Sequence, residues 1–218
     1  MTRLKYPLIC FDLDGTLVDD TIYIWNTLHD GFSTNKEKRK QAYDDFFAGR
    51  ITYRQWFEHD LKLLAEAGAT KSFIHKLLDK MQPMPGAVTL LKKLGKRGHK
   101  IAIISGSLDI VVTHMFPNFA FDHVLINTIE FNPDGTINGG NPTEYDLQGK
   151  AKGLKKLCQK EGISTAQAAF VGDNINDIWI AQEAGFSIAF NCKSDKLAEV
   201  CNVEVKKEDL LTVYDLMS

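Results

Sequence analysis

Short, mostly apolar runs alternate with helical patterns along this chain, and this alternation restricts its possible folds more than any other feature. Each run reads as a strand buried on both faces, which is typical of parallel sheets. The runs cover Leu8–Phe11, Lys100–Ile104, Val124–Asn127, Ala168–Gly172 and Phe186–Phe190. Strands that alternate with helices predict an α/β fold, in which crossover helices cover both faces of a parallel sheet.

Between the first two of these strands, the pattern is helical from about Asp19 to Gln82. Its first part has apolar residues at three-residue spacing, at Ile22, Trp25 and Leu28. Glycines interrupt the pattern and separate three further helical candidates. These candidates are Lys36–Ala48, Thr52–Ala67 and Thr70–Met81. We therefore predict a core made of residues 1–18 and 84–218, with a helical cap of residues 19–83 inserted into it.

A second departure from the alternation follows the third strand. There Asp134 and Gly135 stand between two short stretches of alternating residues, Thr128–Phe131 and Thr136–Asn138. An Asp-Gly pair in this context predicts a β-hairpin. Such a hairpin could serve as a flap over a crevice at the sheet edge.

Composition excludes several classes of protein. The chain has 218 residues, of which 44% are hydrophobic and 25% charged, which suits one large or two small globular domains. The net charge of -2 does not indicate a basic surface for binding nucleic acid, so a small-molecule partner is expected. The four cysteines form no CxxC pair, and no apolar run approaches the roughly 18 residues of a membrane span, so we expect a cytoplasmic protein.

Paired carboxylates follow two of the predicted strands. Asp12 and Asp14 come directly after the first strand, and Asp173 and Asp177 come after the fourth. Ligands of open parallel sheets bind beyond the carboxyl ends of the strands. Close carboxylates repel, so they either share a proton or hold a cation, and oxygen ligands suit Mg²⁺. The alternatives are a solvated turn at the first pair and a helix cap with a dipole-stabilising acid at the second.

Two further positions suit the binding of an anion. Ser105 and Gly106 stand at the predicted junction of the second strand with a helix, where backbone N–H groups attract anions, although a simple serine N-cap is the alternative. A lysine, either Lys150 or Lys152, opens the helix that follows the hairpin. Its ammonium would balance a nucleophilic carboxylate and a phosphoryl group.

Four ordered motifs now resemble those of the haloacid dehalogenase (HAD) superfamily. They are "DLDGT" from Asp12, "ISGS" from Ile104, a lysine before "KGLKKL", and "GDNIND" from Gly172. The helical insertion resembles the small cap of the phosphoserine phosphatase-like branch. The resemblance implies a three-layer Rossmann-like core and a magnesium-dependent phosphomonoester hydrolase that works through an aspartyl-phosphate intermediate.

The resemblance also implies a role for each matched residue. Asp12 would be the nucleophile, and Asp14 the general acid and base, with its backbone carbonyl on the metal. Asp173 would complete the magnesium site with Asp12 and Asp14. Asp177 would lie behind this site and orient a metal-bound water or the lysine. The phosphate ligands would be Ser105, Gly106, Asn176 and Lys150, with Lys152 as the alternative to Lys150.

Two positions depart from phosphoserine phosphatases. Where that branch has an acid for the serine ammonium and an arginine for its carboxylate, this chain has Thr21 and Asp60. Neither ion pair can form with those side chains, and the alternative is that Asp19, Asp20, Arg50 or Arg54 supply the charges instead. The resemblance therefore covers phosphatase chemistry but not serine specificity. The alternative functions are a phosphotransferase that uses the same phosphoenzyme and a non-catalytic binding protein on this fold. The sequence does not indicate an oligomeric state.

Overall fold

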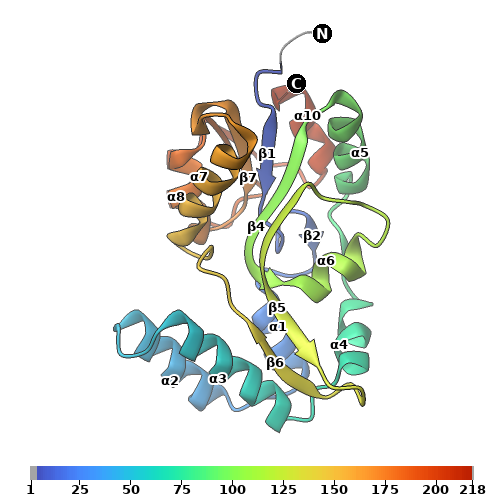
Figure 1. Ribbon diagram of the computed structural model, residues 1–218, viewed down its shortest axis with the longest axis vertical. Helices are drawn as coiled ribbons and strands as arrows, with labels where there is room; N and C mark the ends of the chain where they lie inside the picture. Colours follow the sequence, from blue (N-terminus) through green and yellow to red (C-terminus); the bar gives the residue numbers. More distant parts are fainter. Residues whose placement is uncertain (1–3, 218) are drawn as a thin grey trace.

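The computed structural model describes residues 4–217 and has a seven-stranded sheet at its centre (Figure 1). The strands stand in the order β6-β5-β4-β1-β7-β8-β9, and all neighbours are parallel except β5 and β6. Their bounds are β1 Leu8–Phe11, β4 Lys100–Leu108, β5 His123–Phe131, β6 Ile137–Asn141, β7 Ala168–Gly172, β8 Phe186–Phe190 and β9 Val203–Val205. The predicted α/β fold with a parallel sheet is confirmed.

The alternation of side chains along β1 explains why helices cover both faces of the sheet. Leu8 and Cys10 share one apolar cluster with residues of α7, α8 and α9, whereas Ile9 and Phe11 share another with α5, α6 and α10. All four side chains of β1 are fully buried, as a central strand requires. The helices on the two faces are α7 Gly149–Glu161, α8 Ile178–Glu183, α9 Asp195–Val200, α5 Ala87–Arg97, α6 Asp109–Met115 and α10 Tyr214–Met217.

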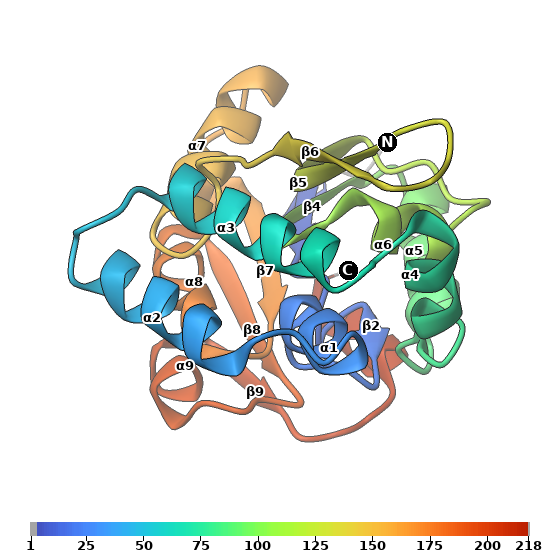
Figure 2. The same cartoon turned by 90° about the horizontal axis from the view of Figure 1, so that it is seen from below.

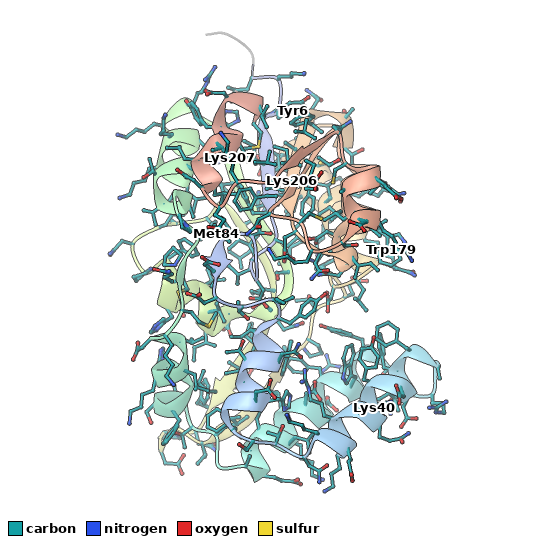
Figure 3. All side chains as sticks on the ribbon, turned by 180° about the vertical axis from the view of Figure 1, so that it is seen from behind. Tyr6, Lys40, Met84, Trp179, Lys206 and Lys207 are labelled. Atoms are coloured by element: carbon teal, nitrogen blue, oxygen red, sulfur yellow. The ribbon has the colours of Figure 1, made fainter. Side chains whose placement is uncertain are left out.

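Four helices inserted between β1 and β4 lie across the end of the sheet away from the two chain termini (Figures 1 and 2). They are α1 Ile24–Gly31, α2 Lys36–Phe47, α3 Tyr53–Glu66 and α4 Lys71–Leu78. The chain leaves and re-enters the core side by side, through an antiparallel pair of two-residue strands, β2 Val18–Asp19 and β3 Gln82–Pro83. Met84, at the point of return, is buried in the interior (Figure 3).

The predicted hairpin is present and is attached to the helical insertion. β5 and β6 pair antiparallel, and Gly135 in the turn between them has a φ of 85°, which favours glycine. The backbone N–H of Lys71, the first residue of α4, donates to the carbonyl of Gly135 at 2.8 Å. The hairpin therefore contacts both the sheet and the insertion.

Several parts of the fold differ from the prediction. β4 continues to Leu108 instead of ending at Ile104, and β5 is one strand from His123 to Phe131 where two separate stretches were predicted. The short elements β2, β3, α9 and β9 were not predicted. β4 is extended because its pairing with β5 resumes at Leu108 and Asn127 after a register shift. Within residues 4–217, no helix has the length and apolar character needed to cross a membrane.

Candidate active site

Three neighbouring strands bring polar residues together at one end of the sheet. Asp12 and Asp14 follow β1, Ser105 and Gly106 lie in the last part of β4, and Asp173 follows β7. β1 lies between β4 and β7, so the carboxyl ends of these strands are adjacent. The inserted helices lie across the same end of the sheet (Figure 2). This is the location at which open parallel sheets bind ligands.

Lys150, in the first turn of α7, lies between two carboxylates. Its Nζ is 2.8 Å from Asp12 Oδ2 and 2.7 Å from Asp177 Oδ1, and the lysine is fully buried. Burial opposes the charge of the ammonium, but the facing carboxylates outweigh it and hold the pKa of Lys150 above its ordinary value. Lys152 is exposed. Of the two lysines that the sequence left open, Lys150 is the one that contacts the carboxylates.

Three carboxylates form a compact cluster beside this ammonium. One oxygen from each of Asp12, Asp173 and Asp177 lies within 4.8 Å of the other two. Asp173 Oδ1 accepts a hydrogen bond from Thr16 Oγ1 at 3.1 Å, whereas the buried Asp173 Oδ2 has no hydrogen-bond partner within residues 4–217. Burial and the two neighbouring carboxylates raise the pKa of Asp173 well above its ordinary value. An unpaired carboxylate oxygen in a cluster of acids fits a hard divalent cation such as Mg²⁺.

The oxygens of Asp177 already have protein donors. Its Oδ1 pairs with Lys150, and its Oδ2 accepts hydrogen bonds from the backbone N–H groups of Asp173 at 3.1 Å and Asn174 at 3.4 Å. Asp177 therefore holds the lysine and the turn after β7 in place. Both oxygens of Asp12 also have donors, Lys150 at Oδ2 and the backbone N–H of Leu13 at Oδ1, at 2.8 and 2.7 Å. Asp173, with its unpartnered Oδ2, is therefore the cluster member best placed to contact an ion directly.

The carboxyl group of Asp14 faces a different environment. Its Oδ1 accepts a hydrogen bond from Ser107 Oγ at 2.8 Å, and its Oδ2 accepts one from the backbone N–H of Ile24 at 2.7 Å. Burial raises the pKa of Asp14 to about 7; the Ile24 N–H opposes this rise and the Asp12 carboxylate adds to it. A carboxyl group with such a pKa can both give and take a proton near neutral pH. The expected contact of its backbone carbonyl with a metal stays a prediction.

Ser105 and Gly106 lie inside a strand, although the sequence predicted a strand-to-helix junction. The helix α6 begins only at Asp109, because β4 continues past an irregularity after Ile104 and pairs with β5 again at Leu108. Ser105 is buried, and its Oγ accepts a hydrogen bond from the backbone N–H of Ser107 at 3.2 Å. An anion here would therefore meet strand N–H groups and hydroxyls, not the N-terminus of a helix.

Asn176 lies in the 3-10 turn after β7, between the cluster and α8. Its amide oxygen Oδ1 is buried and has no hydrogen-bond partner among the described residues. The structure thus places Asn176 in the same turn as Asp173 and Asp177, with a polar atom that is available to a ligand.

Two glycines lie where the backbone comes close to carboxylate side chains. Gly15 has a φ of 74°, and a Cβ atom there would lie 2.3 Å from Asp173 Oδ2. A Cβ atom on Gly106 would lie 2.3 Å from the carboxyl carbon of Asp146, in the loop before α7. These two glycines let the chain approach carboxylates that any side chain would displace.

Comparison of the sequence with models of protein families identifies the family of this chain. The model of the haloacid dehalogenase-like hydrolases matches residues 6–185. The chain belongs to this family of hydrolases. Its carboxylates, serine and lysine stand at the ends of the strands and the start of α7 within this matched range.

Individual relatives of this HAD-like hydrolase are phosphoserine phosphatases. A phosphoserine phosphatase of Methanocaldococcus jannaschii is 30% identical over 94% of this chain and 95% of its own. One of Archaeoglobus fulgidus is 27% identical over 96% of this chain and 59% of its own. A solved phosphoserine phosphatase with bound substrate has a TM-score of 0.76 and 26% identity, covering 99% of this chain and 100% of that one. The chain is therefore a HAD phosphatase of the phosphoserine phosphatase-like type.

The two positions that depart from phosphoserine phosphatases lie in separate environments of the helical insertion. Thr21 Oγ1 lies 2.9 Å from Thr27 Oγ1, at the start of the insertion. Asp60 is buried in α3, where His29 Nε2 lies 3.7 Å and Arg39 Nε lies 4.0 Å from its Oδ2. Asp60 thus stands against cationic and polar groups within the insertion of this HAD phosphatase.

A hydrogen-bonded network joins the helical insertion to the strands of the core. Tyr53, the first residue of α3, donates from its hydroxyl to Asp146 Oδ2 at 3.0 Å and accepts from Asn127 Nδ2 at 3.0 Å. Asn127 Nδ2 also donates to the carbonyl of Gly106 at 2.8 Å, and Trp25 Nε1 donates to the same carbonyl at 3.0 Å. The sequence did not identify Asp146 or Asn127 as site residues. Asn127 could have been identified, because it is a polar residue at the end of an apolar run.

Replacing Tyr53 with Phe should lower kcat/KM about tenfold, through the loss of this link between α3 and the core. Two hydrogen bonds of about 1 kcal/mol each disappear, and Asp146 and Asn127 each lose a partner. Steady-state kinetics on any ester that the enzyme hydrolyses would measure the effect. Tyr214→Phe, at a partly exposed tyrosine of α10 in the core, is the matched control. Equal losses in both variants would contradict a specific role of the Tyr53 hydroxyl.

Proposed function

We propose that this HAD phosphatase hydrolyses a small phosphate monoester through an aspartyl-phosphate on Asp12. One observation carries the proposal. Asp12 is a buried carboxylate that belongs to the three-acid cluster and also contacts the ammonium of Lys150 at 2.8 Å. A carboxylate held between a cation site and a fixed ammonium is suited to attack an anionic phosphoryl group.

The chemistry divides between two aspartates. A carboxylate oxygen of Asp12 bonds to phosphorus, the bond from phosphorus to the ester oxygen breaks, and that oxygen takes a proton from Asp14. Asp14 then takes a proton from the water that attacks the acyl phosphate, which releases inorganic phosphate and restores Asp12. The hydrogen bonds from Ser107 and Ile24 hold the Asp14 carboxyl in one orientation.

The remaining site residues bind and orient the phosphate. Lys150 balances its charge, Ser105 and Gly106 supply a hydroxyl and a backbone N–H, and Asn176 supplies its amide. Mg²⁺, held by Asp12, Asp173 and the backbone carbonyl of Asp14, would stabilise negative charge on the phosphoryl oxygens. The unpaired oxygen of Asp173 supports this ligand set.

We further propose that residues 19–83 act as a cap on a core of residues 1–18 and 84–218. The antiparallel pair of β2 and β3 supports this division, because the insertion leaves and returns to the core through adjacent strands. A cap over the strand ends would exclude bulk water during phosphoryl transfer. Four free cysteines agree with the proposed location in the cytoplasm.

The first test is phosphate release from a panel of phosphate monoesters, phosphoserine included. We expect turnover with Mg²⁺, loss of turnover with EDTA, and recovery when excess Mg²⁺ is returned. Phosphoserine should not be the best ester, because Thr21 and Asp60 cannot supply its ion pairs. Turnover that resists EDTA would contradict the metal assignment, and phosphate transfer to added alcohols would favour a phosphotransferase.

A further inference from the structure

Two histidines face each other where the helical insertion meets the core. His75 lies in the last turn of α4, and His114 lies in the last turn of α6. These two helices are neighbours in both views of the ribbon (Figures 1 and 2). The Nδ1 atoms of the two rings are 3.0 Å apart, and the ring centroids are 5.1 Å apart. We call these two side chains the histidine pair; one belongs to the insertion and the other to the core.

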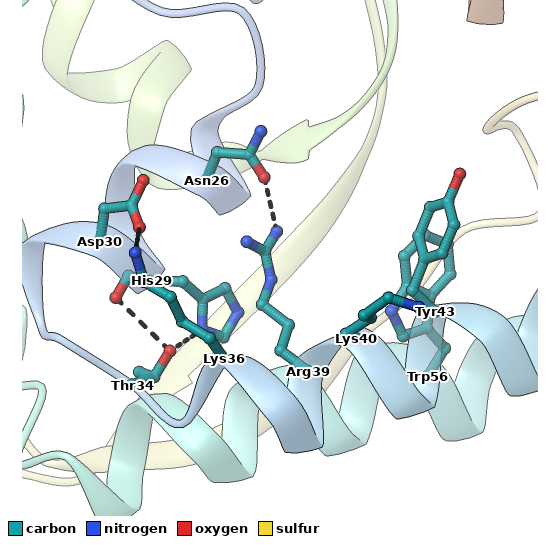
Figure 4. A pocket seen from close by; sticks show the side chains of 9 residues that line it. All are labelled: Asn26, His29, Asp30, Thr34, Lys36, Arg39, Lys40, Tyr43 and Trp56. Carbon is teal, nitrogen blue, oxygen red and sulfur yellow. Dashed lines mark hydrogen bonds and ion pairs between the residues drawn. The ribbon is translucent and has the colours of Figure 1, made fainter.

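The other histidines in residues 4–217 contact groups that are not imidazoles. His29 Nδ1 lies 2.7 Å from Thr34 Oγ1, beside a cavity of about 280 Å³ that α1 and α2 line (Figure 4). The remaining contacts are those of His59 with Asp60, of His99 with the carbonyl of Tyr6, and of His123 with Glu161. In this part of the chain, two imidazole nitrogens meet only at the histidine pair.

A carboxylate stands behind one ring of the histidine pair. Asp79 Oδ1, at the residue that follows α4, lies 3.2 Å from His114 Nε2. A carboxylate in this position favours the tautomer that carries its proton on Nε2, which leaves a lone pair on Nδ1. Histidines that bind metals are typically oriented in this way, by a carboxylate at the other ring nitrogen. His114 Nδ1 is therefore suited to be a ligand.

The separation of the two Nδ1 atoms suits a chelated ion. With metal–nitrogen distances of about 2.0–2.1 Å, two imidazole nitrogens lie about 2.9 Å apart at a right angle and about 3.3 Å apart at a tetrahedral angle. The observed 3.0 Å lies between these values. In the metal-free pair, His75 donates its Nδ1 proton to His114. When an ion binds, that proton moves to His75 Nε2, and both Nδ1 atoms become ligands.

The histidine pair is accessible to ions and selects a different class of ion from the acidic cluster. The side chain of His114 is 22% exposed and that of Asp79 is 64% exposed. Asp79 attracts a cation, whereas the ammonium of Lys71, which acts on His75 from the start of α4, opposes it. Imidazole ligands suit Zn²⁺, Cu²⁺ and Ni²⁺, whereas Mg²⁺ prefers oxygen.

We propose that His75 and His114 chelate a transition-metal ion, with Zn²⁺ as the first candidate, and that this ion joins the helical insertion to the core. Water completes the coordination. One consequence rests on the proposed phosphatase function. Asp12 and Asp173 are only 3% and 1% exposed, so a substrate reaches them when part of the insertion moves away. An ion that holds α4 on α6 opposes this movement and slows turnover.

Isothermal titration with ZnCl₂ at about pH 8, where imidazole is neutral, tests the site. Excess Mg²⁺ is present to occupy the acidic cluster. We expect one Zn²⁺ per wild-type chain, and binding about tenfold to a hundredfold weaker in Asp79→Asn. His75→Asn should weaken binding by about a hundredfold or more, because the amide can still donate to His114 but is a poor zinc ligand. His123→Gln, at a histidine that contacts Glu161, is the matched control and should bind Zn²⁺ like the wild type.

Two binding results would overturn the proposal. No Zn²⁺ binding by the wild type would show that the histidine pair is a hydrogen bond only. Equal binding by the wild type and His75→Asn would place the zinc at another site. Circular dichroism of His75→Asn checks that the variant is folded.

Turnover at saturating Mg²⁺ tests the consequence separately. Without zinc, His75→Asn should hydrolyse esters like the wild type, because His75 lies outside the catalytic site. Zn²⁺ should lower kcat of the wild type severalfold and leave His75→Asn almost unchanged. Equal inhibition of both would contradict the joining of insertion and core as the cause. If no ester is hydrolysed even without zinc, the proposed function fails, and the titration still decides whether the histidine pair binds metal.

Discussion

Asp12→Asn should reduce phosphate release by about a thousandfold or more. The amide cannot form the acyl phosphate, and it removes one carboxylate from the cluster that would hold Mg²⁺. Asn has nearly the same shape as Asp, and Lys150 keeps its contact with Asp177, so the variant should remain folded. Initial-rate assays of inorganic phosphate, with circular dichroism of the purified variant, would measure both effects.

A matched control for this variant is Asp195→Asn, at an exposed carboxylate in the first turn of α9. This variant should keep full turnover, because Asp195 is outside the acidic cluster. Full activity of Asp12→Asn would rule out Asp12 as the nucleophile. A stable phosphorylated wild-type enzyme trapped on Asp12 would support the assignment directly.

Lys150→Met should lower kcat/KM by about a hundredfold to a thousandfold, which is typical for the loss of a group that stabilises developing charge. It should also lower the free energy of unfolding by about 3–5 kcal/mol, because Asp12 and Asp177 lose their buried counter-charge. Lys152→Met, two residues along the same helix at an exposed position, should change neither quantity much.

The effect of Mg²⁺ on stability is a second test of the role of Lys150. A bound cation would replace part of the missing positive charge, so added Mg²⁺ should restore more unfolding free energy to Lys150→Met than it adds to the wild type. Urea unfolding with and without Mg²⁺ would measure this difference. Equal losses in Lys150→Met and Lys152→Met would contradict the assignment of Lys150.

The sequence predicted the α/β class, the buried strands and the hairpin because these depend on local patterns. β1 has the predicted bounds Leu8–Phe11, and the turn at Gly135 joins β5 to β6. The sequence also predicted the carboxylates of the site, because Asp12 and Asp173 directly follow apolar runs. The predicted end of β4 at Ile104 was wrong. Ser105 and Gly106 are typical of a turn, but pairing with β5 resumes at Leu108 and extends the strand.

The tertiary structure alone decided which distant residues meet. The bond from Ser107 to Asp14 spans 93 positions, and so does the bond from Tyr53 to Asp146. The pairing of Lys150 rather than Lys152 with Asp12 likewise depends on where α7 packs. Residue periodicity reports the faces of one element, whereas strand order, register and helix packing determine contacts between elements. The sequence by itself thus determined the element types and the acidic strand ends, and the fold determined how they combine into one site.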